Sequence, residues 1–254
     1  MGFFEAFMSN KERVVTGFSL LGILLVVGLI DNLFVMWLFL GVVYIIAFME
    51  SQKLFSIKDN SLVIYALALW LIAGIYPYGD DLFVLAGVGY AGAVAFNKEL
   101  KWDSFLPFIY PTAGMLFMLT MYQEYGVYSL FWLLLIVAMT DVGAYTVGKN
   151  IGKTPFCETS PNKTMEGVVG GIIVATLSGS FAGLGIVDFG VAFVISAFVS
   201  ISSIFGDLFE SSLKRKANVK DSGDILPGHG GVLDRVDGYL FGGVVMLILL
   251  RGLV

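Results

Sequence analysis

The chain has 254 residues, of which 57% are hydrophobic and only 14% are charged, and its mean hydropathy is +0.87. Soluble domains carry about 25% charged residues, so this chain lacks the polar side chains that would cover a soluble globule of its size. Its net charge of −5 argues against nucleic acid as a partner. The composition predicts an all-α integral membrane protein, a polytopic bundle of helices.

The counts of cysteine and histidine exclude several kinds of site. Cys157 is the single cysteine, which excludes an intrachain disulfide and any cysteine-rich zinc site. His229 is the single histidine, which excludes metal sites that need two histidine ligands. Ser-His-Asp chemistry would depend on His229 alone.

About nine apolar stretches are expected to be transmembrane helices, because each is near the roughly 20 residues that a helix needs to cross the hydrocarbon core. Backbone amides in lipid have no water to bond, which favours helices. The third and fourth stretches are short and could instead form a re-entrant hairpin over residues 61–96. The stretches lie at 14–30, 33–49, 61–76, 82–96, 104–122, 127–147, 167–187, 189–209 and 236–253.

The basic residues set the expected orientation. Of the 15 Lys and Arg residues, 14 lie before the first stretch, as Lys11 and Arg13 do, or in every second loop after it. The remaining one, Arg251, ends the last stretch on the other side. The positive-inside rule then predicts a cytoplasmic N-terminus, in a multi-pass protein of the cell (inner) membrane.

Polar residues gather in the second half of the chain. The two long loops there, 148–166 and 210–235, are both expected on the cytoplasmic side, where nucleotides are found. We expect a single integral membrane domain over residues 1–254. Within it, residues 127–254 would form the catalytic half, and residues 1–126 a scaffold that serves dimerisation.

Asp141 is an ionisable residue within an apolar stretch. Such residues are expensive in the membrane and are functional candidates, although an Asp paired with a Lys for structure is the alternative. The segment GKNIGKT at 148–154 is not a P-loop, because three residues rather than four separate its glycines and a membrane helix precedes it. It could contact phosphate, or it could be an ordinary cationic loop at the lipid surface.

The segment at 160–171, SPNKTMEGVVGG, is expected to begin a helix with Pro161 in its first turn. Lys163 and Thr164 would then lie near a helix N-terminus, which is a favourable place for an anion. Ordinary capping and positive-inside charge would produce the same pattern, so this segment alone decides nothing.

Residues 200–243 form the segment richest in charge. Asp207 falls at the end of an apolar helix, and Asp234 and Asp237 are three apart at the start of the last helix, so they share one face. Carboxylates with neighbouring Lys and Arg suit Mg²⁺ and phosphate groups. The segment therefore predicts phosphoryl or nucleotidyl transfer at the cytoplasmic membrane face. Within it, His229 would contact phosphate or order the loop.

Residues 211–237 read SSLKRKANVKDSGDILPGHGGVLDRVD and resemble the signature of the phosphatidate cytidylyltransferases, the CDP-diacylglycerol synthases. Three upstream segments resemble other blocks of that family in the same order: DVGAY at 141–145, SPNKT at 160–164 and FGD at 205–207. The resemblance covers about the C-terminal half of the chain, whereas the N-terminal half agrees only in being apolar and multi-spanning.

The resemblance implies that CTP and phosphatidate react, with Mg²⁺, to give CDP-diacylglycerol and pyrophosphate. It also implies a homodimer, and that Asp207 and Asp234 are metal ligands. Asp141 would orient a lysine or hold a second cation. We expect the catalytic residues to be Asp207, Asp234, Asp237, Lys220 and Asp221. Substrate phosphates are assigned to Lys163, Lys214, Arg215, His229, Arg235, Ser160 and Thr164.

The nearest alternative is a CTP-dependent lipid kinase of the polyprenol type, from a related superfamily. It would transfer the γ-phosphoryl group to an alcohol and release CDP, so the products distinguish the two reactions. A transporter with acids along its pathway is the non-enzyme alternative. A transporter does not require residues for Mg²⁺ and phosphate to be confined to one face of the membrane.

Overall fold

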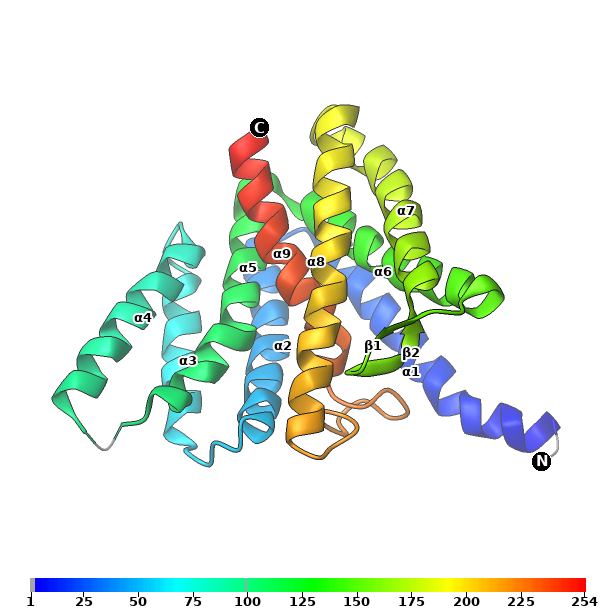
Figure 1. Ribbon diagram of the computed structural model, residues 1–254. Coiled ribbons are helices and arrows are strands. Elements are labelled where there is room, and N and C mark those ends of the chain that lie inside the picture. Colours follow the sequence, from blue (N-terminus) through cyan, green and yellow to red (C-terminus); the bar gives the residue numbers. More distant parts are fainter. Residues whose placement is uncertain (1–2, 99) are drawn as a thin grey trace.

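A computed structural model describes residues 3–98 and 100–254 of the chain, with side chains from residue 14 onward. This part of the chain is almost entirely helical (Figure 1). The helices are α1 (Phe3–Ile30), α2 (Leu33–Leu54), α3 (Ser61–Ala73), α4 (Gly79–Phe96), α5 (Ala113–Tyr125), α6 (Val127–Ile151), α7 (Met165–Ala182), α8 (Phe189–Lys216) and α9 (Leu233–Leu253). Short helical turns are η1 (Trp102–Phe105), η2 (Phe108–Thr112) and η3 (Gly183–Gly185).

Each of the nine apolar stretches predicted from the sequence is mostly helical, which confirms the all-α polytopic fold. In the described chain, seven helical segments are long and apolar enough to cross a membrane: α2, α4, Trp102–Tyr125, α6, α7, α8 and α9. Two apolar helical segments are shorter than these seven: Val14–Ile30, which is the apolar part of α1, and the whole of α3. At 1.5 Å per residue the 13 residues of α3 span roughly 20 Å, less than the hydrocarbon core of about 30 Å.

The loops that carry basic residues gather at one end of the molecule. Figure 1 shows the start of α1, the α2–α3 and α4–α5 connections and the loop after α8 at the lower end of the view, opposite the C-terminus. Lys58, Lys101 and Lys220 lie in these connections. The fold therefore sets these basic segments apart from the end that carries the C-terminus, as the alternation of basic residues predicted. The side chains of Lys11 and Arg13 lie outside the described residues.

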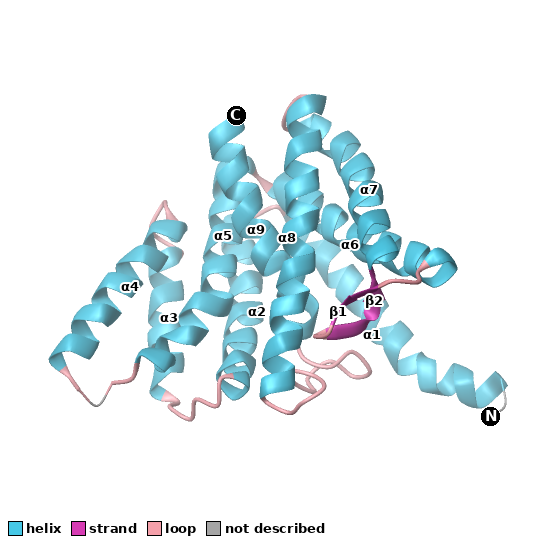
Figure 2. Ribbon diagram, viewed as in Figure 1, coloured by secondary structure: helices cyan, strands magenta, loops and turns pink. Residues whose placement is uncertain are grey.

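The predicted helix start at Pro161 is wrong. Residues Ser160–Thr164 form strand β2, which pairs antiparallel with β1 (Pro155–Cys157) in a small hairpin (Figure 2). α7 begins only at Met165, because Thr164 is its N-cap and its Oγ1 accepts a hydrogen bond from the Gly167 N–H at 3.2 Å. Lys163 and Thr164 nevertheless lie beside a helix N-terminus, as the sequence predicted.

Glycines let the helices of the second half pack closely. A Cβ atom on Gly171 of α7 would lie 2.6 Å from the backbone oxygen of Thr140 on α6, so these helices meet almost backbone to backbone. On α8, a Cβ atom on Gly206 would lie 2.5 Å from the backbone oxygen of Asp237 on α9. Gly206 directly precedes Asp207, and this close approach brings the acidic residues of α8 and α9 to one helix contact.

At the end that carries the C-terminus, Arg251 joins α9 to two other helices. Its guanidinium donates to both oxygens of Asp80 on α4, at 2.5 and 3.2 Å, and to both oxygens of Glu124 on α5, at 2.5 and 3.0 Å. Asp80 is only 8% exposed. Two bidentate pairs of this kind fix the orientation of the Arg251 guanidinium and place its positive charge beside two carboxylates. Arg251 therefore has a structural role far from the basic loops.

We expect Arg251→Ala to destabilise the fold by about 1–3 kcal/mol, because it leaves Asp80 poorly solvated and without its cation. At about 2–4 °C per kcal/mol for a chain of this length, the melting temperature in detergent should fall by several degrees. Lys216→Ala removes an exposed lysine at the end of α8 and should leave the melting temperature unchanged. Equal melting temperatures for both variants would contradict the structural role of Arg251.

Candidate functional site

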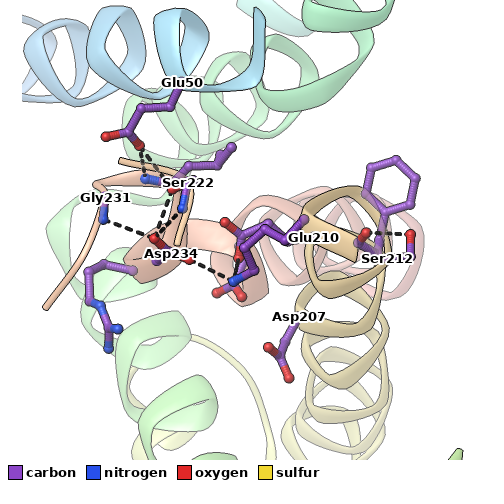
Figure 3. Close-up of polar contacts among 12 residues, drawn as sticks. Glu50, Asp207, Glu210, Ser212, Ser222, Gly231 and Asp234 are labelled. Carbon is purple, nitrogen blue, oxygen red and sulfur yellow. Dashed lines mark hydrogen bonds and ion pairs between the residues drawn. The ribbon is translucent and has the colours of Figure 1, made fainter. Parts of the chain in front are cut away.

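Carboxylates and a lysine meet where α8 contacts the first turn of α9 (Figure 3). The Lys214 ammonium group donates to Asp234 Oδ1 at 2.6 Å and to Glu210 Oε2 at 3.1 Å. Glu210 and Lys214 are one turn apart on α8, and Asp234 lies in the first turn of α9. The exposed fractions of these side chains are 14% for Lys214, 4% for Asp234 and 0% for Glu210. Their charges therefore interact more strongly than they would in water.

The second oxygen of Asp234 is also held. Asp234 Oδ2 accepts hydrogen bonds from the Ser222 N–H at 2.8 Å, from Ser222 Oγ at 2.9 Å and from the Gly231 N–H at 2.9 Å. The neighbouring Gly230 has φ +83°, a conformation that glycine adopts without strain. The loop between α8 and α9 thus wraps around Asp234 and fixes the orientation of its carboxylate.

A residue of the N-terminal half completes this arrangement. Glu50, near the end of α2, accepts hydrogen bonds from the N–H groups of Val232 at 3.1 Å and Leu233 at 2.7 Å, and from Ser222 Oγ at 3.3 Å. Figure 3 shows Glu50 pointing from α2 toward Ser222 and the loop. α9 has no cap from its own N-cap side chain, so Glu50 satisfies amides of this helix N-terminus from another helix.

Asp207 of α8 forms an ion pair with Lys163 of β2. Both side chains are partly exposed, at 32% and 30%. Burial lowers the pKa of Lys163, and the negative charges of Asp141 and Asp237 oppose that shift. Lys163 thus pairs with Asp207 of α8, and the charges of Asp141 on α6 and Asp237 on α9 also act on it.

A cavity of about 420 Å³ lies beside this ion pair. Asp141 and Lys149 of α6 line it together with Lys163 and Thr164 at the end of the hairpin. Its volume lies within the range of about 300–1,000 Å³ that is common for ligand pockets. Asp141 thus shares a cavity with Lys163, and the charges of Lys163 and Arg235 act on its carboxylate. Of the two polar loops that the sequence singled out, the one at 148–166 lines this cavity.

His229 and Arg235 hold the loop before α9 together. Arg235 Nε donates to the backbone oxygen of His229 at 3.1 Å, and the His229 N–H donates to the backbone oxygen of Leu226 at 2.8 Å. Thr16 Oγ1 of α1 donates to the backbone oxygen of Pro227 at 3.1 Å. Both of these His229 contacts are made by its backbone, so the two roles predicted for its side chain stay predictions.

Four other predicted residues lie at the edge of the site. Arg215, Lys220 and Asp221 are exposed, and Ser160 on β2 is partly exposed. In the described part of the chain they lie outside the hydrogen-bonded cluster around Asp234. Their assignment to catalysis or to substrate phosphates stays a prediction.

Three residues of the cluster were not predicted: Glu50, Glu210 and Ser222. Glu210 had a signal, because it lies three residues after Asp207 and four before Lys214, on the same face of α8. Glu50 also had one, since an acid ends an otherwise apolar stretch. No spacing in the sequence, however, pairs Glu50 with an amide 182 residues later.

The carboxylates of this region suit Mg²⁺, which usually takes one or two protein carboxylates, keeps several waters and binds substrate phosphate. Asp207 is partly exposed. Asp207 and Asp234 each pair with a lysine ammonium group, so both carboxylates lie where a positive charge is favourable. Glu210 Oε1 is buried with no hydrogen-bond donor opposite it among the described residues. Within that part of the chain, no three His, Cys, Asp or Glu side chains form a closed metal site, so waters and substrate oxygens would have to complete the ligands.

Comparisons with known proteins place the whole chain in one family. The profile of the cytidylyltransferase family matches residues 11–253. A phosphatidate cytidylyltransferase of Helicobacter pylori is 40% identical over 252 residues, covering 97% of this chain and 94% of that protein. Phosphatidate cytidylyltransferases of Bacillus subtilis and Thermotoga maritima are 44% and 37% identical over 124 and 152 residues, covering 47% and 56% of this chain and 46% and 56% of those proteins. From a match of this extent, together with the acidic and basic residues that α8, α9 and the hairpin bring together, we conclude that the chain belongs to the cytidylyltransferase family.

Proposed function

We propose that this chain transfers the cytidylyl group of CTP to phosphatidate and releases pyrophosphate, forming CDP-diacylglycerol. The observation that carries the proposal is the cluster of carboxylates and lysines around Asp234 and Asp207, in a chain similar over nearly its whole length to proteins named for this activity. The basic loops at the same end of the fold support a cytoplasmic site in the inner membrane.

The main obstacle to this reaction is repulsion between two anionic substrates. Two like unit charges 4 Å apart repel by about 4 kcal/mol at an effective dielectric constant of 20, and several such pairs are involved. Lys163, Lys214 and Arg235 supply positive charge around the site. The contribution of the chain is therefore mainly neutralisation and orientation of phosphates.

In the proposed step, an oxygen of the phosphatidate phosphate forms a bond to the α-phosphorus of CTP. The bond between the α-phosphorus and the oxygen that leads to the β-phosphate breaks, and pyrophosphate leaves with that electron pair. A phosphate monoester is already ionised near neutral pH, so the attack needs no general base. Lys163 and Lys214, now paired with carboxylates, are long and flexible enough to contact these phosphates.

Asp207 and Asp234 are the residues that would hold Mg²⁺, with Asp237 as a further ligand or as a residue that supports these ligands. When bound, the ion would neutralise negative charge on the triphosphate. Asp141, in the neighbouring cavity, would orient Lys163 or hold a second cation. Each of these roles rests on the carboxylate positions described above.

A second cavity supports a lipid as the acceptor of the cytidylyl group. It measures about 280 Å³ and lies between α1, α2, α5, α6 and α9. Arg235 is the one charged residue among the described side chains that line it. A phosphomonoester with a hydrocarbon tail matches this surface, because the tail would fill the apolar part while the phosphate lies at Arg235.

We expect Leu24→Trp to raise the KM for phosphatidate about 10-fold and to leave the KM for CTP unchanged, because an indole there would fill the apolar cavity that Leu24 lines. Leu25→Trp is the matched control, since Leu25 is 47% exposed on the same helix and does not line the cavity. The two KM values are measured in mixed micelles. Equal effects on both substrates, or equal effects of both variants, would argue against a tail site in this cavity.

The proposed reaction is tested by its products. Purified protein is incubated with CTP, Mg²⁺ and phosphatidate, and we expect CDP-diacylglycerol and pyrophosphate in equal amounts. A sample with a polyprenol in place of phosphatidate should yield neither product. Release of CDP with phosphorylation of the polyprenol would instead identify a CTP-dependent lipid kinase.

A further inference from the structure

We propose that Glu50 is a positioning residue that holds Asp234 and the loop between α8 and α9 in the reactive arrangement. This inference rests on the function proposed above and adds a residue from the half of the chain expected to serve as a scaffold. Glu50 is 1% exposed and lies near the end of α2, a helix that belongs to no predicted part of the site.

The burial of Glu50 has a specific physical reason. A carboxylate removed from water is unfavourable unless hydrogen bonds replace its hydration. Glu50 receives two from the Val232 and Leu233 amides and shares the single proton of the Ser222 hydroxyl with Asp234. The amides belong to the N-terminus of α9, where the helix dipole also favours negative charge. The Glu50 carboxylate thus supplies both hydrogen-bond acceptors and negative charge at the start of α9.

Ser222 connects Glu50 to Asp234. Its hydroxyl lies 3.3 Å from Glu50 Oε2 and 2.9 Å from Asp234 Oδ2, and its N–H donates to the same Asp234 oxygen. Asp234 itself lies one residue after Leu233, whose amide Glu50 binds. Glu50 therefore fixes the residues on both sides of the Asp234 carboxylate, although no direct contact between the two acids is needed.

The loop leaves little room for any other arrangement. A Cβ atom on Gly231 would lie 2.7 Å from Glu50 Oε2, and one on Gly223 would also collide with the Glu50 carboxylate. The loop backbone passes directly over Glu50 at two glycines. Replacing one carboxylate oxygen by an amide nitrogen would set one of the two α9 amides against another donor and would loosen this part of the loop.

The test combines turnover with limited proteolysis of the purified full chain in detergent. We expect Glu50→Gln to lower kcat at least 100-fold while the KM for CTP changes less than threefold. Trypsin should cleave after Lys220, in the loop, at least 10-fold faster than in the wild type. Gln52→Ala is the matched control, because Gln52 lies on the same turn of α2 and its side chain donates to the Asp59 backbone oxygen, away from the loop.

The outcomes separate this inference from the proposed function. If wild type and Gln52→Ala turn over while Glu50→Gln matches them in kcat and in cleavage, Glu50 has no positioning role. If the wild type makes no CDP-diacylglycerol, the proposed function fails, and faster cleavage in Glu50→Gln alone still supports the structural link. Should Glu50→Gln not fold, Glu50→Asp keeps the charge on a shorter side chain. It should show intermediate turnover and cleavage, and wild-type values for both would overturn the inference.

Discussion

Asp234→Asn should lower kcat by about 10³-fold, the size of effect seen when a polar group central to charge stabilisation is lost. The substitution keeps the shape of the side chain but removes its charge. Asp234 accepts four hydrogen bonds through its two oxygens, from Lys214, Ser222 and Gly231. In the Asn variant, an amide nitrogen replaces one of these oxygens, and this nitrogen cannot accept the hydrogen bonds that the oxygen accepted. Turnover is measured with CTP and phosphatidate at saturating concentrations.

The fold of Asp234→Asn should survive, with a loss of stability of about 1–3 kcal/mol from the mismatched hydrogen bonds. Asp224→Asn is the control, because Asp224 is an exposed acid of the same loop. It should retain wild-type turnover. Near-normal kcat in Asp234→Asn, or an equal loss in Asp224→Asn, would show that the carboxylate of Asp234 has no special part in the reaction.

Asp207→Asn should abolish most turnover and raise the Mg²⁺ concentration needed for half-maximal activity at least 10-fold. Asp207 is the partly exposed carboxylate that pairs with Lys163, and its removal takes away a proposed ligand while Lys163 loses its partner. A partly exposed ion pair adds only about 0–1 kcal/mol, so the melting temperature should change little. The Mg²⁺ dependence of the rate is the decisive measurement.

Glu158→Gln is the control for Asp207→Asn, since Glu158 is an exposed acid in the turn of the same hairpin that carries Lys163. Its Mg²⁺ dependence should match that of the wild type. If Asp207→Asn keeps both the wild-type rate and the wild-type Mg²⁺ dependence, the assignment of Asp207 to the metal is wrong.

Local patterns in the sequence were enough to predict the helices and much of the acidic cluster. Apolar stretches of sufficient length predict helices because lipid leaves the backbone no other partner. The spacing of Asp234 and Asp237 predicts a shared face because helical geometry is local. The contact between α8 and α9 was less evident, since it depends on Gly206 meeting the backbone of Asp237 on another helix.

Contacts between distant segments could not be predicted in this way. The Glu50 carboxylate caps a helix that begins more than 180 residues later, and nothing in the local pattern around Glu50 specifies that partner. The pairing of Lys163 with Asp207, and of Lys214 with Asp234, depends on how the hairpin and α9 dock against α8. Pro161 was misplaced because the strand pairing of Ser160 with Cys157 competes with an earlier helix start.

The most direct test of the central claim follows the phosphorus atoms of CTP. Two samples of CTP, one radioactively labelled at the α-phosphorus and one at the γ-phosphorus, are incubated with the wild type and phosphatidate. The α-label should enter the lipid fraction and the γ-label should remain in water-soluble pyrophosphate, and Asp234→Asn should transfer neither. Entry of the γ-label into lipid, or α-label transfer by Asp234→Asn at the wild-type rate, would contradict cytidylyl transfer at this site.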